Sequence, residues 1–347
     1  MRKAAIVYWY DGTQMRLDGG GQRILAWQHA LEASGYECEV FGLWTIGGGI
    51  SKGARLSATK RALLPMPLTR RVPDGAVDAD LVVATVPAVF ADALTRVPRE
   101  RLILDWMDLW SVNARNIGDA KWLSRPGGRA QSQLWARREA RLISESAANI
   151  FAGYGDFEQM QKFARTRSSW IPTPICSKAG DRSPRAIRTI GFIGNLDYPA
   201  NQLSLRSFLE EYAGHLKDNQ IELVVAGYGS DRVSAWGFDV SVLGSVPSVE
   251  NFYSMIDAAV VPIHHGGGIK VKAVEALAFR LPVFGTAHVE SGFCPALRSL
   301  IQPLEMLKQP LGLPAVTAER QAAFEQRFSQ DAFTESVGNE LKRLHTK

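Results

Sequence analysis

The chain has 347 residues, 46% of them hydrophobic and 22% charged, which is typical of a globular protein of about two domains. No apolar run approaches the roughly 18–20 residues of a membrane span, and three widely spaced cysteines exclude a disulfide framework, so we expect a cytoplasmic protein. The net charge of +5 is uneven, with 23 Lys and Arg against 17 Asp and Glu in residues 1–170, and 17 against 18 in residues 171–347.

The basic excess is concentrated in residues 52–71 and again in residues 125–141. Residues 52–71 mix Lys and Arg with Leu, Met and Pro. We expect a solvated loop and helix face here. The alternative is a surface that holds a peripheral protein on an anionic membrane at the inner face of the cell membrane, or that attracts an anionic acceptor. No recognition helix or aromatic stacking motif accompanies the charge, so nucleic acid is not an expected partner.

The first half of the chain alternates predicted strands and helices. Strands are predicted at residues 4–10, 37–43, 80–86, 102–106 and 148–152, and helices at 22–34, 129–145 and 157–164. Residues 19–21, three consecutive glycines, are predicted to form a turn. Strands that alternate with helices predict a parallel, doubly wound sheet of the α/β class.

The second half repeats the plan. Strands are predicted at residues 189–193, 221–226, 240–243, 258–263 and 281–285, and helices at 201–212, 248–255 and 270–279. Between the halves, residues 169–174 contain two prolines, which favour extended chain, and we expect the interdomain linker there. The expected domains are therefore 1–170 and 171–329. A last helix within 330–347 is expected to pack back on one of the two domains, the N-terminal one by preference.

The most informative motif is the glycine run 266–268, which follows a short apolar strand and precedes a predicted helix. Glycines let the backbone approach a ligand and turn its N–H groups toward it. The helix start adds the positive end of its dipole, and Lys270 and Lys272 add full charges. Glu275 lies one turn beyond Lys272, where a carboxylate accepts hydrogen bonds from ribose hydroxyls. The pattern predicts a site for the diphosphate of a nucleotide.

This loop belongs to a series of motifs along the second half. They are residues 190–201, 223–229, 242–246, 266–278, 281–283 and 290–292. Their order and spacing resemble the GT-B glycosyltransferases, and in detail the glycosyltransferase family 4 type, across residues 189–293. The first half is similar more loosely, through the Gly-Gly-Gly-x-Arg run at residues 19–23 and through residues 35–40.

The resemblance implies a GT-B fold, in which two Rossmann-like doubly wound domains face each other across a cleft. It implies a sugar transfer from a nucleotide-diphosphate sugar (a UDP- or GDP-sugar) as co-substrate, with no other cofactor. The acceptor is a glycan, a lipid carrier or a small molecule, in bacterial glycan or glycoconjugate synthesis. The expected donor-site residues, beyond the two lysines and Glu275, are Gly20, Gly21, Gly194, Asn195, Leu243, Gly244, Ser245, His265, Gly266, Gly267, Gly268 and Ile269.

Two features of the chemistry also follow from the resemblance. Lys270 and Lys272 would stabilise the leaving pyrophosphate without a metal, and no Asp-x-Asp motif is present to hold one. Family members of this type usually retain the anomeric configuration, and the departing phosphate takes the acceptor proton. An inverting enzyme would instead need a base near the acceptor, for which Asp11, Asp105 and Asp108 are the candidates.

One departure from the family pattern keeps further functions open. Many members carry a second Glu eight residues before the ribose Glu, but here that position is Gly267. This departure leaves open a binding module that holds a nucleotide sugar without turnover. A separate alternative is a phosphorylase-like or epimerase-like reaction in the same type of cleft.

Overall fold

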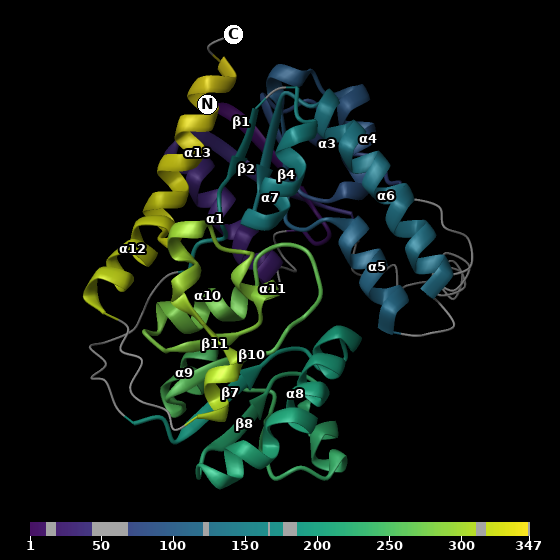
Figure 1. The fold of residues 1–347 in the computed structure, drawn as a ribbon. Helices are drawn as coiled ribbons and strands as arrows, with labels where there is room; N and C mark the ends of the chain where they lie inside the picture. Colours follow the sequence, from purple (N-terminus) through teal and green to yellow (C-terminus); the bar gives the residue numbers. More distant parts are fainter. Residues whose placement is uncertain are drawn as a thin grey trace. The chain divides into compact units, whose positions relative to one another are not determined.

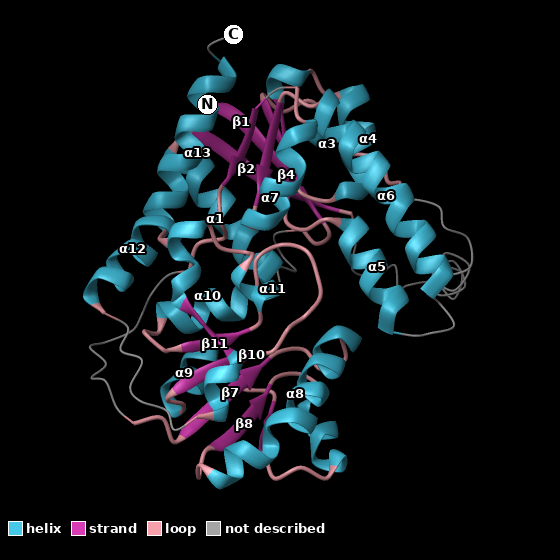
Figure 2. Ribbon diagram, in the orientation of Figure 1, coloured by secondary structure: helices cyan, strands magenta, loops and turns pink. Residues whose placement is uncertain are grey.

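The computed structural model describes residues 1–11, 19–43, 69–120, 125–165, 167–175, 186–309 and 317–345. The chain divides into two compact units. The first comprises Met1–Pro174, Gly267–Ile269 and Gln330–Lys347, and the second comprises Ile175–Gly266 and Lys270–Ser329. Most of the basic segment, residues 52–68, lies outside the described residues. Each unit contains one parallel six-stranded sheet flanked by helices (Figures 1 and 2).

The sheet of the first unit has the strand order β2-β1-β3-β4-β5-β6, with all pairs parallel. Its strands are β1 (Arg2–Tyr8), β2 (Tyr36–Gly42), β3 (Leu81–Ala84), β4 (Leu102–Trp106), β5 (Ala148–Phe151) and β6 (Arg167–Trp170). Every residue of β3, β4 and β5 is buried. Their nearly unbroken apolar sequences fit this position, because a parallel sheet is covered on both faces.

The helices of the first unit follow the strands in the alternation that parallel pairing requires. They are α1 (Gly19–Ala33), α3 (Asp74–Val77), α4 (Pro87–Arg96), α5 (Trp110–Ala120), α6 (Arg125–Glu145), α7 (Tyr154–Met160) and α13 (Gln330–His345). The last helix packs against α1, where Phe333 meets the Trp27 ring edge-on at a centroid distance of 5.6 Å. Residues from both ends of the described chain therefore share one hydrophobic core.

The sheet of the second unit has the order β12-β11-β10-β7-β8-β9, again fully parallel. Its strands are β7 (Thr189–Ile193), β8 (Glu222–Ala226), β9 (Ser241–Gly244), β10 (Ala258–Val261), β11 (Val283–Gly285) and β12 (Ile301–Pro303). Its helices are α8 (Pro199–Asp218), α9 (Val249–Met255), α10 (Val271–Ala278), α11 (Ala287–Glu290) and α12 (Ala318–Phe328).

The strand orders fix where each sheet offers a binding site. In the second unit the chain moves outward from β7 through β8 to β9, and then returns to place β10 on the other side of β7. The first unit does the same at β1, with β2 on one side and β3 on the other. At such reversals the connections leave in opposite directions, and a crevice opens beyond the carboxyl ends of the two strands. The crevices therefore lie at β1/β3 and at β7/β10.

Two sequence-based expectations about local structure were wrong. The glycines 19–21 are not a turn, because α1 already begins at Gly19 and Gly21 is buried in it. Residues 169 and 170 are not linker, because they belong to β6, which pairs with β5 only. This strand has the sequence Arg-Ser-Ser-Trp. An edge strand needs little apolar side chain, so hydrophobicity gave no signal for it.

Candidate functional site

Three strands of the second unit end in glycines that lie in a row. Gly194 follows β7, and its N–H donates to the carbonyl of Ala226 at the end of β8 (3.1 Å). Gly227 follows β8, and its N–H donates to the carbonyl of Gly244 at the end of β9 (2.8 Å). A methyl group at Gly227 would collide with the Gly194 carbonyl. A side chain is thus excluded at Gly227, where the ends of β7 and β8 pack closely against each other.

Lys272 reaches the end of β7 from the first turn of α10. A methyl group at Gly194 would lie only 2.7 Å from its Nζ. The ammonium donates to Oδ1 of Asn201 (3.3 Å) and lies 4.5 Å from the centroid of the Phe192 ring. Burial lowers the pKa of Lys272 to about 7, and Lys270 nearby adds to the shift, while Glu275 opposes it. The lysine is therefore held, partly desolvated, at the β7/β10 crevice.

Lys270 is the residue immediately before α10, so the unpaired N–H groups of the helix start lie beside it. Its Nζ donates to the carbonyl of Gly266 (2.9 Å). Gly266 has a φ of 108°, which side-chain-bearing residues rarely adopt. The same carbonyl accepts a hydrogen bond from Nε2 of His288 (2.8 Å). Two lysines, a helix start and glycine backbone together form an anion site.

His288 is neutral at physiological pH. Burial lowers its pKa to about 4, and Lys270 contributes in the same direction. Because a carbonyl only accepts, the contact with Gly266 places the proton on Nε2 and leaves Nδ1 as an acceptor. His265 and His264 are both exposed next to it.

Glu275 lies one turn after Lys272 on α10 and is 8% exposed. Its Oε2 accepts a hydrogen bond from the Tyr253 hydroxyl on α9 (2.9 Å), and that hydroxyl also lies 3.2 Å from the Lys272 carbonyl. Burial and the neighbouring Glu275 raise the pKa of Tyr253 well above its ordinary value, so the phenol remains a donor. Tyr253 thus fixes Glu275 beside the two lysines.

The expected base-binding residues end β9. Leu243 is 39% exposed, Gly244 has a φ of 68°, and Ser245 is exposed. Asn195 follows Gly194, and its side chain accepts from the N–H of Asp197 (2.8 Å), which stabilises the turn after β7. Ile269 is buried. The structure therefore brings Gly194, Lys270, Lys272, Glu275 and Gly266 together, with residues 243–245 on neighbouring strand ends.

Asp105, expected as a base, has a structural role instead. It is 0% exposed at the end of β4, and its carboxylate accepts from Nη2 and Nε of Arg23 (2.5 and 2.8 Å) and from the Trp27 indole (2.9 Å). Both partners lie on α1. A fully buried carboxylate that already accepts three hydrogen bonds cannot take a proton from an acceptor in the crevice. The pair fastens α1, and with it Gly20 and Gly21, to the sheet.

Asp108 is partly exposed on the loop before α5 and accepts from Nδ2 of Asn113 (2.5 Å). The first unit also contains Gly267 and Gly268, whose N–H groups donate to Asn113 (3.2 Å) and Asp156 (2.7 Å). A methyl group at Gly267 would lie 2.7 Å from the backbone nitrogen of Leu109, so this position has no room for a side chain. Asp11 ends the first described segment, after β1.

Glu139 on α6 is a buried carboxyl group that the sequence did not single out. Its Oε1 accepts from the Ser111 N–H at the start of α5 (3.1 Å), and its Oε2 has no hydrogen-bond partner among the described residues. Burial raises its pKa to about 7. Tyr253 and His288 were likewise missed, because each comes from an element other than the one that carries the glycine motif. Asn201 ends the motif at residues 190–201, but the sequence assigned it no contact with Lys272.

The described part of the chain lacks two features, a metal-ligand cluster and a membrane-spanning helix. No cluster of three or more His, Cys, Asp or Glu side chains there could hold a metal ion. None of its helices combines the length and the apolar character that a membrane crossing needs.

Residues 187–299 match the family described as glycosyl transferases group 1. These residues are therefore similar to a group 1 glycosyl transferase domain. The match contains β7, Lys270, Lys272 and Glu275. No curated protein matches the sequence.

Solved structures extend the likeness to the whole chain. The Anabaena protein HepE, solved with UDP and glucose, has 14% identity and a TM-score of 0.62, with coverage of 99% of this chain and 100% of HepE. A glycosyltransferase from Rickettsia africae has 10% identity and a TM-score of 0.64, with coverage of 100% and 99%. TarM is a longer protein, of which the match covers 51%, so the chain spans about half of its length. The match covers 76% of this chain, with 10% identity and a TM-score of 0.48. The fold is that of a GT-B glycosyltransferase.

Proposed function

We propose that the protein transfers a sugar from a nucleotide-diphosphate sugar to an acceptor hydroxyl, with retention and without a metal. The observation that carries this proposal is the position of the Lys272 ammonium against Gly194, at the β7/β10 crevice and beside Lys270. Two cations and a helix start within one crevice suit a diphosphate, because each lowers the free energy of the negative charge that develops on the leaving group.

The donor in this proposal is a UDP-sugar. HepE was solved with UDP and glucose. The pneumococcal O-GlcNAc transferase GtfA was solved with UDP and GlcNAc, and it is 14% identical, with a TM-score of 0.50 and coverage of 85% of this chain. Leu243, Gly244 and Ser245 would contact the base, and Glu275, held by Tyr253, would accept from the ribose hydroxyls. The acceptor would be a hydroxyl of a bacterial glycan or glycoconjugate.

The proposed chemistry needs no side-chain base, since the departing phosphate takes the acceptor proton. An inverting reaction would need a base with an accessible carboxylate. Asp105 is fully buried and already accepts three hydrogen bonds, which favours Asp108 and Asp11 as the candidates. The configuration of the product, read by NMR, separates the two mechanisms.

The test is a thermal-shift screen against UDP, GDP, ADP and dTDP with the Lys272→Ala variant alongside. A nucleotide present at 100 times its Kd stabilises the folded protein by about 2.7 kcal/mol. Lys217→Ala is the matched control. Lys217 is an exposed lysine in the last turn of α8, whereas Asn201, the residue that contacts Lys272, lies in the first turn of that helix. Stabilisation by UDP that is lost only in Lys272→Ala supports the proposal. No response to any nucleotide would refute it, and binding without sugar transfer or donor hydrolysis would favour the non-catalytic binding module.

A further inference from the structure

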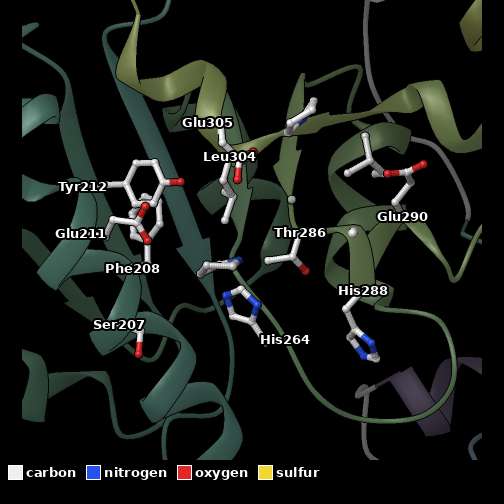
Figure 3. Close-up of a pocket in the computed structure, with 15 residues that line it drawn as sticks. Ser207, Phe208, Glu211, Tyr212, His264, Thr286, His288, Glu290, Leu304 and Glu305 are labelled. Carbon is white, nitrogen blue, oxygen red and sulfur yellow. The ribbon is translucent and has the colours of Figure 1, made fainter.

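The second unit has a cavity that neither the glycine motif nor the proposed diphosphate contacts account for. It measures about 410 Å³ and lies beyond the carboxyl ends of β10 and β11. This is within the range of about 300–1,000 Å³ that small-molecule sites occupy. In Figure 3 the rings of Phe208 and Tyr212 stand on one side, Thr286 and His288 stand on the other, and His264 lies between them.

The cavity has an apolar floor and a polar rim. The floor includes Phe208 and Tyr212, whose rings stack at 4.9 Å with an interplanar angle of 13°. The rim carries Ser207, His264 and Glu305, all exposed. Phe208 and the Lys308 ammonium, 4.9 Å from the ring centroid, already cover the Tyr212 ring, so the match to a sugar lies in the rim. Its hydroxyl, imidazole and carboxylate groups suit the hydroxyls at the edge of a pyranose.

The cavity adjoins the anion site through a single carbonyl group. The Gly266 carbonyl accepts from Lys270 (2.9 Å) and from His288 (2.8 Å), and His288 lines the cavity. Strands in a sheet lie about 4.8 Å apart, so the ends of β7, β10 and β11 span about 10 Å. That is comparable to a diphosphate followed by one sugar ring.

The strand order arranges the three parts of a donor in sequence. The base-binding residues end β9, the diphosphate lysines face the β7/β10 crevice, and the cavity lies at β10 and β11. Along the sheet this order is β9, β8, β7, β10, β11. We propose that the cavity binds the sugar ring of the nucleotide-sugar donor. This inference rests on the proposed function and adds which residues select the sugar.

The charges of the rim define the class of sugar. Three carboxylates line the cavity, Glu211, Glu290 and Glu305, and of these Glu211 pairs with Lys308 (2.6 Å). A uronic acid would bring a further negative charge beside the other two, and like charges repel. The cavity therefore selects neutral or amino hexoses over uronates.

The experiment measures what the sugar adds to nucleotide affinity. Titration calorimetry with UDP, UDP-glucose, UDP-GlcNAc and UDP-glucuronate gives four dissociation constants for each protein. We expect at least one neutral UDP-hexose to bind the wild type about tenfold or more tightly than UDP, as two or three hydrogen bonds provide, and UDP-glucuronate to show no such gain.

The variants place this gain in the cavity. Ser207→Trp should fill the cavity from the exposed face of α8, and it should remove the gain while leaving the Kd for UDP within about twofold. His264→Ala should lower the gain without an added bulky group. Glu210→Trp is the matched control, because Glu210 is exposed on the same helix and does not line the cavity.

The outcomes separate this inference from the proposed function. A gain that survives in Ser207→Trp and in His264→Ala, or UDP-glucuronate binding as tightly as UDP-glucose, overturns the inference while the proposed function stands. UDP-hexoses that bind wild type no more tightly than UDP overturn it as well. If UDP itself fails to bind, the UDP-sugar donor of the proposed function falls, and the inference falls with it.

Discussion

Lys272 should make nucleotide binding depend on pH, because its ammonium is partly desolvated at the β7/β10 crevice. Its pKa is lowered to about 7, so about half of the side chains are charged at pH 7. One phosphate charge at about 4 Å contributes roughly 4 kcal/mol at an effective dielectric constant near 20, which raises the pKa by about 3 units. Binding of UDP therefore takes up a proton between about pH 7 and 10.

The expected magnitude follows from these two pKa values. Between pH 7.5 and 9 the Kd for UDP should rise roughly twentyfold, since each unit above the pKa of the free protein costs up to about a factor of ten. The diphosphate of UDP keeps its charge in this range, because the second ionisation of a phosphate monoester lies near about pH 6. Calorimetry in two buffers of different ionisation enthalpy measures the proton uptake directly.

Lys272→Met should bind UDP more weakly and lose most of this pH dependence. The stability of the wild-type protein without UDP should depend on pH in the opposite sense to its affinity for UDP. A folded-state pKa of about 7 against the ordinary 10.5 means that the folded state binds fewer protons in this window, so its stability rises with pH. The reasoning is refuted if the Kd of the wild type changes by less than about threefold, or if Lys272→Met keeps the wild-type slope.

Two further predictions concern the first unit. Asp105→Asn should lower the free energy of unfolding by about 3–5 kcal/mol in urea titrations, because it leaves the buried Arg23 without its carboxylate; a loss below 1 kcal/mol would contradict the structural role of the pair. Glu139→Gln should stabilise the protein at pH 8, by at most about 3 kcal/mol, and not at pH 4.5. The folded-state pKa of Glu139 is raised from 4.5 to about 7, so wild-type stability falls as pH rises through that interval, and equal melting curves at pH 8 would count against this reasoning.

The sequence predicted much of the second unit because its signals are local. Strand 189–193 agrees with β7, and helix 270–279 contains α10, since apolar periodicity and flanking glycines mark both. Strand 102–106 agrees with β4 for the same reason. The polar edge strand β6 carries no such signal. The helix α4 was not predicted either, although Pro87 stands at its first turn, a position that proline favours.

The roles of side chains were harder to predict than the elements. Asp105 stands where ligands gather in α/β sheets, so the sequence favoured a catalytic role. Its partner Arg23 lies 82 residues earlier, and only the fold brings the two together. Tyr253 and His288 reach the lysines in the same way, from helices that contain none of the motif. A motif defines the chemistry of a loop, whereas its supporting contacts come from tertiary structure.

The position of α13 has a consequence for how the protein is made. Phe333, Val337 and Leu341 belong to the same core as Trp27 and Ile24, although some 300 residues separate them. A ribosome releases the chain from its N-terminus, and domains generally fold as units while they emerge. Most of the first unit is thus synthesised long before the helix that completes its core. The second unit, with all of its strands between residues 189 and 303, can finish folding first. During that interval the apolar face of α1 is not yet covered by α13, and it is exposed to aggregation or to chaperone binding.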